Sequence, residues 1–105
     1  MDERTPDKIV EISKRYLALL IENNIQFTRA YLFGSYLKGK QNEFSDIDIA
    51  IFSEKWLPSK FDALQNLLKL RRKVDLRVEP HPFDEGEGDD PIVKEILQTG
   101  KKIVA

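Results

Sequence analysis

The stretch Gly34-Ser-Tyr-Leu-Lys-Gly-Lys-Gln-Asn-Glu-Phe-Ser-Asp-Ile-Asp-Ile49 organises the rest of the chain. It follows an apolar run that ends at Phe33 and leads into a second apolar run that ends at Phe52. The second run begins with alternating polarity, which predicts a β-strand whose residues two apart point to the same face. Asp46 and Asp48 are therefore expected to project together, with the isoleucines between and after them on the opposite face.

This pair of carboxylates predicts a site for a cation. Two carboxylates side by side repel each other unless a cation or a shared proton lies between them. Hard divalent ions such as Mg²⁺ prefer carboxylate oxygens, and they usually complete their coordination with water and substrate phosphates. Gly34 lets the backbone turn tightly and approach a phosphate, and Ser35 offers a hydroxyl and a backbone N–H at the same turn. We therefore expect a metal ion and a phosphate group to meet here.

The order of these features closely resembles the signature of the DNA polymerase β-type nucleotidyltransferase superfamily. The matching features are Gly34-Ser35, a ten-residue spacer, Asp46-Ile-Asp48 and a later segment, Val74-Asp75-Leu76. The small size of the chain narrows the resemblance to the minimal nucleotidyltransferase branch. The resemblance implies that the Gly-Ser turn holds the nucleotide phosphates. It also implies that Asp46, Asp48 and Asp75 are the catalytic carboxylates and bind two Mg²⁺ ions.

Three further side chains are candidates for contact with the nucleotide, each with a plain alternative. Lys38 would neutralise triphosphate charge, or it is a solvated surface lysine. Ser45 would orient Asp46, or it is an ordinary turn serine. Arg77 would share a strand face with Asp75 and bind a phosphate, or it pairs with a neighbouring carboxylate.

The resemblance also implies a reaction and a partner. Most minimal members of the family are adenylyltransferases, which makes ATP the expected donor and AMP the transferred group. Lone minimal domains are commonly paired with a helical HEPN-type protein as antitoxin and toxin, which implies a protein acceptor. Two alternatives remain open: a non-catalytic module that neutralises its partner by contact, and an enzyme acting on a small molecule such as an aminoglycoside. No residue visibly selects the base.

Length and composition exclude several other classes. A chain of 105 residues is expected to form one domain spanning residues 1–105, too small to enclose a large second substrate alone. The net charge of −1 gives no bulk attraction to nucleic acid, and the absence of cysteine excludes disulfides and thiolate metal sites. No apolar run approaches the length of a membrane span, about 18 residues, so a cytoplasmic location is expected.

The pattern along the chain predicts an α+β fold, a small mixed twisted sheet backed by helices. Pro80-His81-Pro82 is expected to end the third strand, which makes His81 a turn residue. Residues 84–90 are acidic and rich in glycine, and we expect a mobile loop there. The expected elements are a helix over Pro6–Glu22, strands over Ile25–Phe33 and Asp46–Ser53, a helix from Ser59 to about Arg72, a strand over Val74–Glu79, a helix over Pro91–Thr99 and a short edge strand within residues 101–105.

Overall fold

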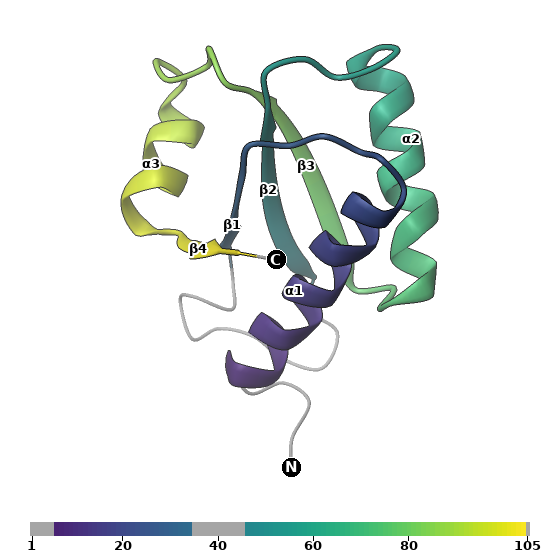
Figure 1. The fold of residues 1–105 in the computed structure, drawn as a ribbon. Coiled ribbons are helices and arrows are strands. Elements are labelled where there is room, and N and C mark those ends of the chain that lie inside the picture. Colours follow the sequence, from purple (N-terminus) through teal and green to yellow (C-terminus); the bar gives the residue numbers. More distant parts are fainter. Residues whose placement is uncertain (1–5, 35–45, 105) are drawn as a thin grey trace.

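The computed structural model describes residues 6–34 and 46–104, which fold into a four-stranded sheet with α-helices on both faces (Figure 1). None of these helices is long and apolar enough to cross a membrane. In chain order the elements are α1 (Pro6–Glu22), β1 (Arg29–Phe33), β2 (Ile47–Ser53), α2 (Lys60–Leu70), a 3₁₀ turn (Arg71–Lys73), β3 (Val78–Asp84), α3 (Pro91–Thr99) and β4 (Lys101–Ile103).

The sheet is mixed, with the strand order β3-β2-β1-β4. β1 runs antiparallel to both β2 and β4, whereas β3 runs parallel to β2. The end of β1 and the beginnings of β2 and β3 therefore lie at the same end of the sheet (Figure 1). This end contains Gly34 and Asp48.

The alternation predicted for β2 is confirmed by its packing. Ile47, Ile49 and Ile51 are fully buried in the core formed with α1 and α2. Ala50 and Phe52 point to the other face, where they pack against two apolar side chains of α3. Because α3 covers this second face only beside the later part of β2, Asp48 stays about one quarter exposed, with 23% of its side chain accessible.

The helix boundaries follow from local signals and match the prediction closely. α1 ends where Asn24 adopts a left-handed conformation with φ of 60°. The Ser59 side chain accepts a hydrogen bond from the backbone N–H of Asp62 at the start of α2. The Asp90 side chain caps α3 in the same way, ahead of Pro91. Such caps satisfy N–H groups that have no partner inside the helix.

Two of the predicted strands have wrong boundaries. β1 begins at Arg29, four residues later than expected, and β3 begins at Val78 rather than Val74. β3 also continues through Pro80 and Pro82 to Asp84 instead of ending before them. The reason is that β3 is an edge strand. Pro80 and Pro82 are two residues apart, so their backbone nitrogens face the same side of β3. That side is the outer edge of the described sheet, where no neighbouring strand requires an N–H donor.

The acidic segment after β3 is anchored to the fold, contrary to the expectation of a mobile loop. Glu85 pairs with Arg29 of β1 at 2.8 Å. Lys60, the first residue of α2, lies 3.0 Å from Glu87 and 3.5 Å from Asp84. The segment therefore connects the end of the sheet where β2 and β3 finish to the start of α2.

Candidate active site

Asp48 lies at the centre of the end of the sheet where β1 stops. It pairs in register with Phe33 of β1 on one side and with Glu79 of β3 on the other. Residues opposite each other in neighbouring strands point to the same face, so these three side chains share a face. His81 lies two residues beyond Glu79 and faces the same way. Glu79 and His81 therefore form a partly exposed polar patch beside Asp48.

The backbone of Gly34 makes room for the Asp48 carboxylate. Gly34 has φ of +87°, in the left-handed region that side chains other than glycine rarely adopt. A Cβ added to Gly34 would lie 2.3 Å from Asp48 Oδ2 and 3.2 Å from its Cγ. An oxygen of the Asp48 carboxylate thus occupies the space that a side chain at residue 34 would need. Gly34 and Asp48 therefore form one structural unit.

The second oxygen of Asp48 is held by the only histidine of the chain. His81 Nε2 lies 3.1 Å from Asp48 Oδ1. The imidazole ring also rests edge-on against Phe33, with ring centroids 5.1 Å apart. One oxygen of Asp48 therefore faces His81 and the other faces Gly34, which fixes the plane of the carboxylate.

Two more carboxylates flank this unit. Asp46 is exposed and immediately precedes β2, and strand alternation places it on the same side as Asp48. Glu79 is 39% exposed, and its Oε2 accepts a hydrogen bond from Arg71 Nη1 at 3.2 Å. Carboxylate oxygens are the donors that Mg²⁺ prefers, and one or two carboxylates with substrate phosphates and water commonly hold it, so the pair Asp46 and Asp48 is chemically suited to a hard divalent ion.

Asp75 lies elsewhere, in the turn before β3, because the third strand starts later than predicted. Its Oδ1 accepts hydrogen bonds from the backbone N–H and Nε of Arg77, and its Oδ2 accepts one from Nη2 at 2.7 Å. The hydrogen bonds from the Arg77 side chain hold the pKa of Asp75 below its ordinary value. The expectation that Asp75 and Arg77 share a strand face is therefore wrong. The pair closes the turn that leads into β3.

Asp75→Asn is expected to destabilise the fold by about 1 to 2 kcal/mol at neutral pH, because it weakens charge-assisted hydrogen bonds in a mostly buried pair. A lowered pKa in the folded state gives stability that is complete above the unfolded value and is lost as pH falls through the folded value. The difference between wild type and variant should therefore shrink in acid. Urea unfolding at neutral and acidic pH measures it, with Asp89→Asn, an exposed carboxylate, as the matched control. A difference that is constant with pH would contradict this role.

Comparisons with known proteins identify the family of this chain. Residues 15–105 match the family model described as Polymerase beta, Nucleotidyltransferase. The chain belongs to this family. It is 34% identical over 77 residues to a candidate protein adenylyltransferase of Methanocaldococcus jannaschii, across 72% of this chain and 76% of that protein. The resemblance carried by the Gly-Ser turn and the Asp pair is therefore confirmed.

Several solved structures share the fold. A toxin–antitoxin structure with AMP-PNP is 28% identical with a TM-score of 0.62, over 90% of this chain and 73% of that one. A variant of the toxin–antitoxin pair MntA–HpeT is 25% identical with a TM-score of 0.57, over 87% and 71%. A nucleotidyltransferase candidate from Sulfolobus solfataricus is 20% identical with a TM-score of 0.59, over 91% and 78%, which supports the fold alone. The predicted α+β fold of a minimal nucleotidyltransferase is confirmed.

The structure describes only some of the predicted site residues. Ser35, Lys38 and Ser45 lie outside the described residues, so their nucleotide contacts stay predictions. Within residues 6–34 and 46–104, no three acidic or histidine side chains are arranged to hold one metal ion. Asp46 and Asp48 lie at the start of β2, on the same side by strand alternation, while Asp75 is paired with Arg77.

Sequence reasoning missed Glu79 and His81 because it treated the prolines beside them as the end of a strand. The signal was present in the segment Val78-Glu-Pro-His-Pro-Phe83, which alternates between two faces. A residue before proline is confined to extended conformations, and both Glu79 and His81 precede one. An edge strand that carries its prolines on one face would have placed both side chains beside Asp48.

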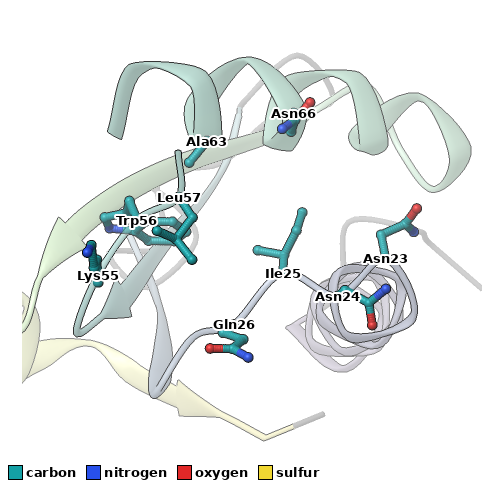
Figure 2. A pocket seen from close by; sticks show the side chains of 9 residues that line it. All are labelled: Asn23, Asn24, Ile25, Gln26, Lys55, Trp56, Leu57, Ala63 and Asn66. Carbon is teal, nitrogen blue, oxygen red and sulfur yellow. The ribbon is translucent and has the colours of Figure 1, made fainter. Parts of the chain in front are cut away.

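A hollow of about 260 Å³ lies at the opposite end of the sheet, beyond the last residue of β2 (Figure 2). It separates the end of α1 from α2, and four carboxamide side chains contribute to its wall. Of the predicted site residues that the structure describes, none lines it. The lining residues are Asn23, Asn24, Ile25, Gln26, Lys55, Trp56, Leu57, Ala63 and Asn66.

Proposed function

We propose that this protein is a metal-dependent nucleotidyltransferase that transfers AMP from ATP to a protein acceptor, as the antitoxin half of a toxin–antitoxin pair. The observation that carries the proposal is the seating of Asp48 against Gly34, with φ of +87° and no room for a Cβ. This contact places a carboxylate beside a backbone turn that can approach a phosphate. A nucleotide phosphate and a metal ion therefore have adjacent binding groups.

The carboxylates of the site and the turn at Gly34 have separate roles in this proposal. Asp46 and Asp48 hold the metal ions, and Glu79 takes the third position in place of Asp75 because it is in register with Asp48. Glu79 would bind the metal ion with the carboxylate oxygen that now accepts a hydrogen bond from Arg71. Bound divalent ions supply charge stabilisation to the attacking and leaving oxygens of the transferred phosphoryl group. Gly34 and Ser35 bind the triphosphate in the proposal.

The relatives support the reaction and the partner. The Methanocaldococcus jannaschii relative is named as a candidate protein adenylyltransferase. One structural relative is a toxin–antitoxin structure with AMP-PNP, an analogue of ATP. Another is an MntA–HpeT variant in which two aspartates, two positions apart, are changed to glutamate. The pair Asp46 and Asp48 has the same spacing. We further propose that the enzyme is cytoplasmic and acts with a helical HEPN-type partner.

The proposal is tested by incubating the protein and its co-purifying partner with Mg²⁺ and ATP labelled at the α-phosphate. We expect label on the partner, none when EDTA replaces Mg²⁺, and none from ATP labelled at the γ-phosphate. The γ-label control separates nucleotidyl transfer from phosphoryl transfer. Calorimetry of ATP binding with Mg²⁺ and with EDTA tests the metal independently, and equal affinities would contradict the two-metal proposal.

The same experiment distinguishes the two alternatives. Label on an added aminoglycoside, and none on the partner, would show a small-molecule acceptor. A complex that forms with the partner but carries no label under any condition would show a neutralising module without catalysis. Either result overturns protein adenylylation.

A further inference from the structure

The segment Glu79-Pro80-His81-Pro82 is a rigid support for the polar patch. Each of its two polar residues precedes a proline, which confines its backbone to the extended region. Pro80 is buried on the opposite face, beside the core formed with α1 and α2. The His81 ring is further fixed by its edge-on contact with Phe33. His81 therefore has little freedom to leave Asp48.

The chemistry of this contact sets the direction of the hydrogen bond. An ionised carboxylate only accepts hydrogen bonds, so the proton between the two groups belongs to His81 Nε2. Nε2 then has no lone pair free for a metal ion, so this nitrogen can act on the site only through Asp48. Asp48 Oδ1 accepts this hydrogen bond with one of its lone pairs, and Asp48 Oδ2 lies against Gly34. The carboxylate cannot rotate without losing one contact or colliding with the turn.

We propose that His81 is a positioning residue, which donates a hydrogen bond from Nε2 to Asp48 and holds that carboxylate in its metal-binding orientation. This inference rests on the proposed function. Partners of ligating carboxylates commonly change metal affinity by about 10- to 100-fold when they are removed. The effect here is concentrated in one hydrogen bond, because the bond joins Asp48, near the start of β2, to a strand that contains two prolines.

The hydrogen bond itself can be tested by NMR spectroscopy, independently of catalytic activity. The chain has one histidine, so its imidazole resonances need no assignment. At mildly alkaline pH we expect the Nε2–H tautomer and a downfield ring proton protected from exchange with water. Asp48→Ala should abolish this protection. An Nδ1–H tautomer in the wild type, or protection that survives in Asp48→Ala, would overturn the proposal.

A pair of variants then tests the consequence for the metal. His81→Phe keeps an aromatic ring on Phe33 but removes the donor, whereas His81→Gln supplies a donor at a position similar to Nε2. We expect His81→Phe to weaken Mn²⁺ binding at least about 10-fold by calorimetry, and His81→Gln to recover most of the affinity. The two variants should melt at similar temperatures without metal, and excess Mn²⁺ should largely restore transfer by His81→Phe.

The outcomes separate this inference from the proposed function. If the wild type binds Mn²⁺ and His81→Phe binds it equally well, the positioning role fails while the nucleotidyltransferase proposal stands. If the wild type shows the protected proton but binds no Mn²⁺ with or without ATP, the proposed function fails and the positioning role fails with it. If His81→Phe and His81→Gln lose metal affinity equally at unchanged stability, the imidazole acts directly and the positioning role is overturned.

Discussion

Asp48→Asn is expected to reduce nucleotidyl transfer to about one thousandth of the wild-type rate or less, because a bound metal contributes several kcal/mol to the transition state and each 1.4 kcal/mol is about tenfold. Asparagine has the same shape and keeps an oxygen that can accept the hydrogen bond from His81. It lacks the negative charge that holds a divalent ion between Asp48 and Asp46. The loss should therefore appear in transfer and in Mn²⁺ affinity, and hardly in folding.

Stability is the control that separates this role from a structural one. Removing one of several neighbouring carboxylates relieves like-charge repulsion, so the melting temperature without metal should stay unchanged or rise slightly. Asp89→Asn makes the same chemical change on the exposed segment before α3, and it should alter neither transfer nor stability. A clear drop in melting temperature for Asp48→Asn, or transfer above about one tenth of wild type, would remove Asp48 from the proposed metal site.

Glu79→Gln completes the argument for the third carboxylate. If Glu79 takes the third position, this variant loses transfer nearly as severely as Asp48→Asn. Asp75→Asn should then lose stability while retaining transfer, because the Asp75 carboxylate is bound by Arg77. The opposite pattern, with transfer lost in Asp75→Asn and kept in Glu79→Gln, would return the role to the residue that the sequence pattern first indicated.

The parts of the fold that could be predicted are those set by local chemistry. Pro6 and Pro91 at helix starts, the Ser59 cap and the left-handed Asn24 mark helix boundaries whose signals lie within a few residues. The alternation around Ile49 identifies the buried face of β2 because a central strand must bury one face against helices. These features needed no knowledge of the neighbouring strands.

The third strand could not be predicted in the same way because its identity depends on distant parts of the chain. Proline interrupts a strand only where a neighbour needs its N–H, and the sequence does not state that β3 lies at the sheet edge. Asp75 matched the expected Val-Asp-Leu pattern, but the register with β2 places Glu79 beside Asp48. Strand register is a long-range property, and it decided which carboxylate and which histidine reach the site.

Gly34→Ala is expected to damage the site more than the fold. An alanine at φ of +87° costs about 1 to 2 kcal/mol of stability because its Cβ crowds the backbone in the left-handed region. The same Cβ would lie 2.3 Å from Asp48 Oδ2, so the carboxylate must move. A displacement of about 1 Å in a catalytic group can cost about 100-fold in rate, so transfer should fall at least that far. Gly34→Val should be worse in both respects.

A double-mutant cycle separates the two causes. In an Asp48→Ala background the carboxylate is gone, so Gly34→Ala should retain the backbone strain and lose the part of its cost that comes from the collision. Gly88→Ala is the matched control, since a Cβ there meets nothing within 4 Å, and its effect should stay within about 0.5 kcal/mol. The measurements are urea unfolding for all four members of the cycle, and transfer and Mn²⁺ affinity for Gly34→Ala. Wild-type transfer by Gly34→Ala, or a cost in stability that is the same in both backgrounds, would show that Gly34 is needed for the turn alone and does not seat Asp48.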